Sequence, residues 1–291
     1  MRFGLVGTGP WAEICHAKGL SGAKDVDFIG IYGRNREKVK ALTEKFNVVP
    51  FDDYSQMLAE VDAVSFCVPP AVQEELAVTA ARHGKHLLLE KPISLSGSSA
   101  KRLADAVREA NVASIVFFIF HFAEPERSLL TALKNQTWDG AWLRWFGSAF
   151  STTSPYKDSV WRKDKGALWD LGPHAISILT PILGDIHSVS AVRGKGDLIQ
   201  ISAEHENKAI SISTMSLTSP EASNDIEIAF YGKEGIVKFS RDTEEPAISF
   251  ERAIYELMLS AAVPRPSHEF DVSFGVKVVE LLEKIENSIV E

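Results

Sequence analysis

The sequence predicts an α/β protein in which a doubly wound parallel sheet is followed by an α+β domain with a large, mostly antiparallel open sheet. Residues 1–120 alternate near-continuous apolar runs with amphipathic helical patterns, which is typical of parallel strands covered by helices on both faces. From about residue 121 onward, strand patterns follow one another with few helices between them. Residues 272–290 then have the apolar spacing of an amphipathic helix.

Strands and helices alternate throughout the first predicted domain. The predicted strands are Phe3–Val6, Val26–Tyr32, Val48–Pro50, Ala63–Val68, His86–Leu89 and Ser114–Phe120. The predicted helices are Trp11–Leu20, Arg36–Phe46, Tyr54–Glu60, Glu74–His83 and Ser98–Ala110. Right-handed crossovers between parallel strands then produce the doubly wound arrangement that binds dinucleotides.

The second predicted domain opens with a helix over Glu126–Asn135 and a strand over Trp142–Phe150. Residues 151–172 are expected to be irregular, and a helix over Pro173–Leu183 is expected to begin with proline in its first turn. Lys233–Gly235 predicts a hairpin turn. The further predicted strands are Val189–Arg193, Leu198–Glu204, Ala209–Leu217, Ile226–Tyr231, Ile236–Phe239 and Ala247–Phe250. The predicted domains are therefore 1–120, 121–271 and a C-terminal helix, 272–291, that packs back on the first domain.

Composition and charge narrow the class of protein. The 291 residues are 45% hydrophobic and 24% charged, as in ordinary globular proteins, and the net charge of -8 argues against a nucleic-acid partner. The longest apolar run, Ala113–Phe120, is too short to span a bilayer. We expect no signal peptide, because the first predicted strand begins at Phe3 and leads directly into the glycine-rich loop. Cys15 and Cys67 are too few for a disulfide framework or a zinc site. We expect a cytoplasmic protein without membrane or metal partners.

A glycine-rich segment, Gly7-x-Gly9-x-x-Ala12, lies between a predicted strand and a predicted helix, which is the context that a pyrophosphate-binding loop requires. Gly7 permits the tight turn, Gly9 lets a phosphate approach the backbone, and Ala12 allows the helix to pack closely on the strand. The helix N-terminus attracts the anion. We expect this loop to bind a dinucleotide. The main alternative is that the protein is a methyltransferase that uses S-adenosylmethionine. The expected contacts are Gly7, Thr8, Gly9, Pro10, Trp11 and Ala12.

The end of the second strand discriminates between NAD and NADP. An NAD site places an acidic residue there to accept from the ribose 2′-hydroxyl, but Asp25 and Asp27 lie at the start of this strand. Gly33 leaves space, and Arg34 offers a planar fork for a phosphate. The sequence therefore favours NADP(H) over NAD(H), although a solvated basic helix start has the same appearance. The expected contacts here are Gly33, Arg34, Asn35 and Lys38.

Two further segments carry groups suited to proton transfer. Lys91 follows the predicted strand His86–Leu89, and ligands of doubly wound sheets lie beyond the carboxyl ends of the strands. Asp170 and His174 are four residues apart and are expected near the first turn of one helix, where the N-terminus would keep the imidazole neutral. Such a group can exchange a proton with an alcohol. A structural lysine, a capping aspartate and a packed histidine are the alternatives.

These segments, in this order, resemble the glucose–fructose oxidoreductase / inositol dehydrogenase / MocA family over essentially the whole chain. The resemblance rests on the glycine-rich loop, Glu90-Lys91-Pro92 and the segment from Asp170 to His174. Val68-Pro69-Pro70, Gly84-Lys85-His86 and Trp161-Arg162 are also similar to that family.

The resemblance implies a Rossmann domain, a C-terminal domain whose open sheet forms homodimers or homotetramers, and the oxidation or reduction of sugars, polyols and related carbonyls. By resemblance, Lys91 contacts the reacting oxygen and the nicotinamide ribose, His174 is the acid/base, and Asp170 positions Lys91 or a substrate hydroxyl. The remaining cofactor contacts would be Val68, Pro69, Pro70, Gln73, Glu90, Lys91, Trp161 and Arg162.

Two departures from the family pattern concern the substrate pocket. Gln73 stands where a histidine often follows the fourth strand, and the sixth strand leads into Phe120-His121-Phe122 instead of an Asn-x-Arg-Phe-like segment. The sequence nevertheless favours an NAD(P)-dependent dehydrogenase or reductase acting on a small hydroxylated alcohol or carbonyl. The alternatives are a non-catalytic dinucleotide-binding regulatory protein, and an enzyme that uses the dinucleotide only transiently for elimination or glycoside cleavage.

Overall fold

The computed structural model describes residues 1–239 and 244–290. These residues form two compact units. Unit 1 contains Met1–Ala123 and Glu244–Val279, and unit 2 contains the described residues of 124–239 and 280–290. Residues 244–271, which the sequence pattern assigned to the second domain, thus belong to unit 1, and the C-terminal helix contributes residues to both units.

Unit 1 is built on a six-stranded sheet with the order β3-β2-β1-β4-β5-β6, in which every neighbouring pair is parallel. This is the strand order of dinucleotide-binding doubly wound sheets. Every residue of β4 and the residues Leu87–Leu89 of β5 are buried, which explains their near-continuous apolar sequences. The strands are β1 (Arg2–Val6), β2 (Asp27–Tyr32), β3 (Val49–Phe51), β4 (Ala63–Phe66), β5 (His86–Leu89) and β6 (Ser114–Val116).

Helices connect these strands, and α4 packs on α5 while α1 packs on α8. The helices of unit 1 are η1 (Ala12–Ala17, a π-helix), α1 (Lys18–Gly22), α2 (Arg36–Phe46), α3 (Tyr54–Glu60), α4 (Pro70–Arg82), α5 (Gly97–Ala110), η2 (Ile119–His121, a 3₁₀-helix) and α8 (Pro246–Ala261). The sixth strand therefore ends four residues earlier than predicted. The C-terminal helix is α9 (Val272–Asn287).

The predicted strand Ala247–Phe250 is wrong, because these residues form the first turn of α8. Pro246 supplies the fixed φ of a first helical turn. Phe250, Ile254 and Leu257 then follow at helical spacing and are fully buried. Four apolar-patterned residues are too few to distinguish a strand from the start of a buried helix.

Unit 2 contains a mixed, mostly antiparallel seven-stranded sheet with the order β12-β11-β7-β10-β9-β8-β13. The pairs β10–β7 and β13–β8 are parallel, and the other pairs are antiparallel. Gly232 pairs with Gly235, which confirms the predicted hairpin turn. The strands are β7 (Gly140–Phe146), β8 (Ile186–Arg193), β9 (Ile199–His205), β10 (Ile210–Ser216), β11 (Asp225–Gly232), β12 (Gly235–Phe239) and β13 (Ile289–Val290).

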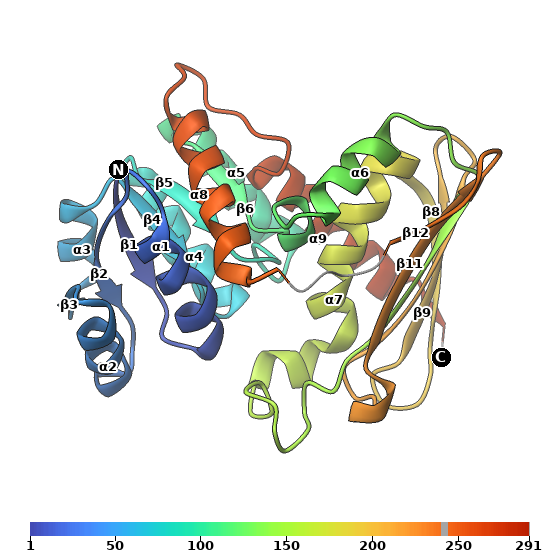
Figure 1. Cartoon of the computed structure of the whole chain (residues 1–291), viewed down its shortest axis with the longest axis horizontal. Coiled ribbons are helices and arrows are strands. Elements are labelled where there is room, and N and C mark those ends of the chain that lie inside the picture. The colour runs from blue at the N-terminus through green and yellow to red at the C-terminus, as the bar shows by residue number, and fades with distance from the viewer. Residues whose placement is uncertain (240–243, 291) are drawn as a thin grey trace. The chain divides into compact units, whose positions relative to one another are not determined.

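Helix α7 (Val160–Leu183) packs on β7, β9 and β10 at one face of this sheet, and α6 (Glu126–Lys134) packs on α7. On the other face, Figure 1 shows no helix among the described residues. A short 3₁₀-helix, η3, spans Glu221–Ser223. On β9, Ile199, Ile201 and Ala203 are buried and alternate with the exposed Gln200 and Ser202, as expected for a sheet with one packed face.

Helix α7 differs from the sequence expectation, which made residues 151–172 irregular and began a helix at Pro173. The helix begins at Val160, is interrupted at Gly166 (φ 64°, ψ −163°), and contains Pro173 in its interior. Asp197 accepts a hydrogen bond from the backbone N–H of Ala167 (3.1 Å) and so satisfies a donor where the helix resumes. The packing of the buried residues 167–179 outweighs the backbone hydrogen bond that the proline removes.

Among the described residues, no helix combines the length and the apolar character that crossing a bilayer requires.

Candidate functional site

The glycine-rich loop of unit 1 joins β1 to a helix that begins at Pro10. Gly7 has φ +132°, and a Cβ atom built on it would lie 2.2 Å from the Cys67 carbonyl oxygen, so only glycine fits there. A Cβ on Gly9 would meet no atom within 4 Å. The backbone of Gly9 is therefore open to an incoming group, at a loop that precedes a helix N-terminus. This cradle fits a dinucleotide pyrophosphate.

The end of β2 lies against the same loop. A Cβ on Gly33 would lie 2.9 Å from Cγ2 of Thr8, which explains why a glycine follows this strand. Asn35 caps α2 by accepting a hydrogen bond from the Lys38 N–H (2.9 Å). Arg34 and Lys38 are exposed and form no ion pair with any described residue, whereas Arg36 pairs with Asp52.

The acidic residues near β2 are at the other edge of the sheet. Asp27 is the first residue of β2 and pairs in register with Arg2, the first residue of β1. It therefore lies at the amino end of the strand, far along the strand from Gly33, and cannot take the ribose-binding role of an acidic residue at the carboxyl end.

Lys91 follows β5 directly, and the carboxylate before it is held by several donors. The indole N–H of Trp11 donates to Oε1 of Glu90 (2.7 Å), and Nε2 of His16 lies 3.1 Å from the same oxygen. The backbone N–H of Lys91 donates to the second oxygen, Oε2 (3.2 Å). The structure thus joins the glycine-rich loop, through Trp11, to the segment that carries Lys91. The Lys91–Pro92 peptide bond is cis.

Gln73 is fully buried and its amide engages the backbone on both sides of Lys91. Its Nε2 donates to the carbonyl oxygens of Glu90 (2.7 Å) and Pro92 (3.3 Å), and its Oε1 accepts from the Glu90 N–H (2.8 Å). The structure therefore places this predicted cofactor contact as a clamp on the end of β5. The other predicted contacts of this region, Val68, Pro69 and Pro70, lead from β4 into α4, where Pro70 is the first helical residue.

In unit 2, Asp170 and His174 lie one turn apart on α7. Nε of Arg162 donates to Oδ2 of Asp170 (2.9 Å), and its guanidinium lies over the rings of Tyr156 (4.4 Å) and Trp161 (4.6 Å). The imidazole of His174 stacks on Trp145, with ring centroids 5.4 Å apart. Asp170, Arg162 and His174 are thus arranged along one helix.

The expected effect of a helix N-terminus on His174 is wrong. The expectation required a helix beginning at Pro173, but α7 resumes at Ala167 after the interruption at Gly166. His174 lies about two turns beyond that point, and the helix-dipole effect is confined to the first turn. His174 is buried instead, with Trp145 against its ring.

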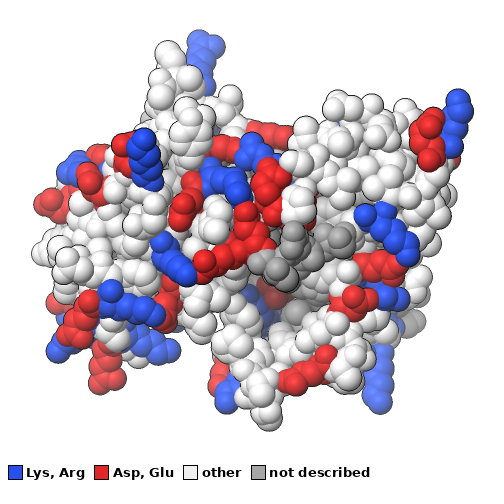
Figure 2. Space-filling model, in the orientation of Figure 1, with Lys and Arg blue, Asp and Glu red and all other residues white. Residues whose placement is uncertain are grey.

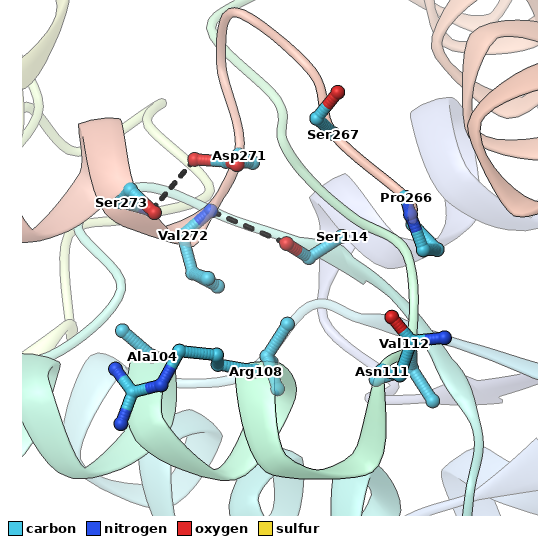
Figure 3. A pocket seen from close by; sticks show the side chains of 11 residues that line it. Ala104, Arg108, Asn111, Val112, Ser114, Pro266, Ser267, Asp271, Val272 and Ser273 are labelled. Atoms are coloured by element: carbon cyan, nitrogen blue, oxygen red, sulfur yellow. Dashed lines mark hydrogen bonds between the residues drawn. The ribbon is translucent and has the colours of Figure 1, made fainter. Parts of the chain in front are cut away.

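Each unit contains a cavity. A cavity of about 420 Å³ in unit 2 is lined by Arg162 together with other mostly polar residues. They include Lys163, Asp164, Arg193, Asp197 and Thr218. A cavity of about 210 Å³ in unit 1 lies between α5 and the segment before α9 (Figure 3). It contains Ser114, the first residue of β6, and so lies at the amino edge of the parallel sheet, opposite the edge that carries Lys91.

Charged side chains of both signs are interspersed over the face shown in Figure 2. Among the described residues, no group of three or more His, Cys, Asp or Glu side chains is placed to hold a metal ion.

Sequence reasoning missed the partners of Glu90. His16, which looks like an ordinary packed residue of the first helix, bridges Glu90 and Ser65. The available signal was Ser65, a polar residue in the otherwise apolar strand β4, because a buried hydroxyl requires a partner.

The fold and the loop define a protein with an NAD-binding Rossmann domain followed by a sheet domain. The family model "Oxidoreductase family, NAD-binding Rossmann fold" matches residues 1–118, and the model "GFO/IDH/MocA C-terminal domain" matches residues 141–238. The chain belongs to the Gfo/Idh/MocA oxidoreductase family.

Similar proteins include glucose-6-phosphate 3-dehydrogenase of Bacillus subtilis, which is 23% identical over 67% of this chain and 57% of that enzyme. The first three curated relatives are matched over only 57%, 36% and 59% of their lengths. The crystal structure of GenD2 from gentamicin A biosynthesis, in complex with NAD, superposes with a TM-score of 0.85 at 22% identity and covers 99% of this chain and 93% of that chain. KijD10, a 3-ketoreductase from Actinomadura kijaniata in complex with TDP-benzene and NADP, has a TM-score of 0.76 at 18% identity, covering 99% and 98%. Because the sequence identities are 22% and 18%, these two solved structures establish the fold of this chain and nothing further.

Proposed function

We propose that this protein is a nicotinamide-dinucleotide-dependent oxidoreductase that interconverts an alcohol and a carbonyl on a sugar, polyol or related small molecule. One observation carries the proposal: the glycine-rich loop and Lys91 lie at the same edge of the sheet and are joined by the Trp11–Glu90 hydrogen bond. A phosphate cradle alone would serve any dinucleotide-binding protein. An ammonium group at the same edge adds a cation that can stabilise a developing alkoxide.

The names of relatives support the substrate class. Those that match this chain include a glucose-6-phosphate 3-dehydrogenase, a levoglucosan dehydrogenase and a myo-inositol 2-dehydrogenase. All three names denote dehydrogenases of hydroxylated ring compounds. The polar lining of the cavity beside Arg162 suits a ligand of that kind.

We assign the transfer of the proton to His174 and the stabilisation of the reacting oxygen to Lys91. The bound nicotinamide supplies the hydride acceptor or donor. In the oxidation direction, His174 accepts the hydroxyl proton while Lys91 stabilises the oxygen, and in reduction the imidazolium returns that proton. Asp170 holds Arg162, and we place both beside the substrate, where the guanidinium can donate to a hydroxyl or an anionic group. Trp161, which stacks on Arg162, would keep this fork in place.

We propose NADP(H) as the preferred dinucleotide. The carboxyl end of β2 has Gly33 and the exposed Arg34 in place of an acidic residue, and Lys38 adds a second cation without an ion-pair partner among the described residues. Two cations are therefore available at this strand end to bind the 2′-phosphate of NADP(H). The ribose hydroxyls of NAD(H) would have no carboxylate there to accept their hydrogen bonds. A requirement for this dinucleotide also favours the cytoplasm as its location.

To test this function, the purified protein is incubated with NADP⁺ or NAD⁺ and each member of a panel of aldoses, phosphorylated sugars, inositols and other polyols. Reduced nicotinamide absorbance and substrate loss are recorded together. Equal formation of reduced dinucleotide and loss of substrate supports the proposal. Substrate loss without net reduction would instead identify a transient use of the dinucleotide, and binding without any turnover would identify a regulatory protein.

The role of His174 is tested by His174→Ala. We expect turnover to fall at least a hundredfold, within the usual contribution of a general acid–base group, while the dinucleotide Kd changes less than about threefold. Ser177→Ala, one turn further along α7, is the matched control, because its hydroxyl donates to the His174 carbonyl oxygen and so makes a local bond within the helix. Equal losses of turnover and dinucleotide affinity would contradict the assignment.

We also propose that a second copy of this chain covers the open face of the seven-stranded sheet. Ile210, Ile212 and Ile236 are 49%, 43% and 60% exposed, and no helix among the described residues covers that face. Exposed apolar side chains grouped on one sheet face are typical of an interface. Light scattering after size exclusion should show a homodimer or homotetramer that Ile212→Lys dissociates. A monomeric parent protein would refute this proposal.

A further inference from the structure

A buried chain of hydrogen bonds runs beneath the glycine-rich loop. His16 has no solvent exposure, and its Nδ1 lies 2.8 Å from Oγ of Ser65 on β4. Its Nε2 lies 3.1 Å from Oε1 of Glu90, which also accepts from the Trp11 indole. Segments that are distant in the sequence therefore meet on one imidazole and one carboxylate, all within unit 1.

The chemistry of these groups fixes the direction of the bonds to Glu90. An ionised carboxylate only accepts hydrogen bonds and an indole only donates them. Nε2 of His16 must therefore carry a proton for its bond to Glu90. The hydroxyl of Ser65 can donate to Nδ1 or accept from it, so it accommodates either form of the imidazole.

With these bonds, both oxygens of the carboxylate are held. Oε1 receives two donors, and Oε2 receives the backbone N–H of Lys91. A carboxylate that accepts several charge-assisted bonds is held more firmly than one with a single partner. The backbone at Lys91 is thus tied through Glu90 to Trp11 and His16.

The imidazole is itself held in one place. It packs against Phe250 with ring centroids 4.2 Å apart, and Phe117 meets its edge at 6.4 Å. His16 belongs to the π-helical segment Ala12–Ala17. Helical turns of this type are rare overall, and those that occur are frequently at functional sites. Burying an imidazole among aromatic rings is costly unless both nitrogens are hydrogen-bonded, as they are here.

We propose that His16 is a positioning residue, which holds the Glu90 carboxylate so that the glycine-rich loop and the Lys91 backbone keep one fixed relationship. This inference rests on the proposed function, because its consequence is the correct placement of Lys91 relative to a bound dinucleotide. His16 touches neither the substrate nor the reacting atoms in this role. It acts through Glu90, whose carboxylate it shares with Trp11.

Two variants separate the two sides of the imidazole. The amide of glutamine reaches the position of Nε2, so His16→Gln can still donate to Glu90. The amide of asparagine reaches only the position of Nδ1, so His16→Asn keeps a partner for Ser65 but loses the bond to Glu90. The matched control is His205→Asn in unit 2, since His205 is equally buried and also bonds through both nitrogens, to the Gly184 carbonyl oxygen and to Ser211.

The first readout needs no activity. The indole N–H resonance of Trp11, identified by its loss in Trp11→Phe, reports the bond to Glu90 in the protein without dinucleotide. We expect His16→Asn to shift this resonance, His16→Gln to restore it toward the parent position, and His205→Asn to leave it unchanged. An unchanged Trp11 resonance in folded His16→Asn would overturn the proposal, whatever the protein's activity.

The second readout compares turnover with binding. We expect His16→Asn to lower kcat at least tenfold with a less than threefold change in KM for the alcohol, and His16→Gln to recover most of kcat. In a Lys91→Met background, the same His16→Asn change should have little further effect, because the group that it positions is gone. Equal losses of kcat in the presence and absence of Lys91 would show a merely structural role. A parent protein that reduces no dinucleotide would refute the proposed function, while the Trp11 resonance would still test His16.

Discussion

Arg162 and Asp170 are joined by a 2.9 Å hydrogen bond between Nε and Oδ2 that spans the interruption of α7 at Gly166. Their side chains are only 20% and 10% exposed, so the ion pair is largely removed from water. A pair in this setting is not a strong source of stability by itself, but removing one partner leaves the other charge poorly solvated. Arg162 also lines the cavity of unit 2, so its bond to Asp170 holds the guanidinium in place beside that cavity.

We predict that Asp170→Asn lowers kcat/KM for the alcohol about tenfold, or about 1.4 kcal/mol, because the guanidinium loses its charged partner. Arg162→Met should cost a similar amount, and the double variant should cost much less than the sum of the two. Asp158→Asn, which changes an exposed acid that does not line this cavity, is the control. Additive losses would show that Arg162 and Asp170 act independently.

Alanine substitutions of Gly7 and Gly9 are predicted to have different effects on stability and on dinucleotide affinity. Gly7→Ala places a methyl group 2.2 Å from the Cys67 carbonyl oxygen at φ +132°, so both the thermal stability and the dinucleotide affinity should fall. Gly9→Ala meets no atom of the protein within 4 Å, so the unfolding midpoint should be retained while the dinucleotide Kd rises about tenfold or more, as expected when a side chain blocks the close approach of the pyrophosphate. Calorimetry and fluorescence titration measure the two quantities. Unchanged dinucleotide affinity in Gly9→Ala would mean that the phosphates bind elsewhere.

Arg34→Ala should reduce the preference for NADP(H). We expect the Kd of NADPH to rise about ten- to hundredfold, which is the range for losing a charge-assisted contact to phosphate, while the Kd of NADH stays nearly constant. Arg36→Ala is the control, since Arg36 already pairs with Asp52. The same loss of affinity for both dinucleotides would place Arg34 outside the 2′-phosphate site.

Stability is predicted to decline in mildly acidic solution. Burial lowers the pKa of His86 below its ordinary value of 6.5, and Nδ1 accepts a hydrogen bond from the Ala113 N–H (3.0 Å), which a protonated ring could not do. Burial likewise lowers the pKa of His205. Because the unfolded chain binds more protons between the folded and unfolded pKa values, the free energy of unfolding should fall as the pH drops below about 6.5.

The thermal unfolding midpoint, followed on both sides of that pH, measures this effect. The amide of asparagine reaches the position of Nδ1, so His86→Asn keeps an acceptor for the Ala113 N–H but does not titrate and should reduce the pH dependence. His83→Asn, at an exposed position, is the control. A pH dependence that His86→Asn leaves intact would assign the effect to other groups.

Much of the fold could be predicted because burial leaves a repeating pattern along the chain. Leu87–Leu89 are buried on both faces of a parallel sheet, so they form a continuous apolar run, while Ile199, Ile201 and Ala203 alternate with polar residues because β9 has one packed face. Where the local pattern was short or contradictory, prediction failed. Ala247–Phe250 resembled a strand, and Pro173 resembled a helix start, but the packing of α8 and α7 decided both.

The sequence by itself determined which chemical groups this protein carries and which ends of which strands they follow, because the period of a strand or helix is a local property. It could place Gly9 and Lys91 at one edge of a sheet without any coordinates. Only the tertiary structure decided which polar groups meet: that Glu90 binds Trp11 and His16, that Gln73 clamps the chain around Lys91, and that Asp170 pairs with Arg162. The physical reason is that a hydrogen bond requires two groups within about 3 Å, and segments distant in sequence reach that separation only when the whole domain packs.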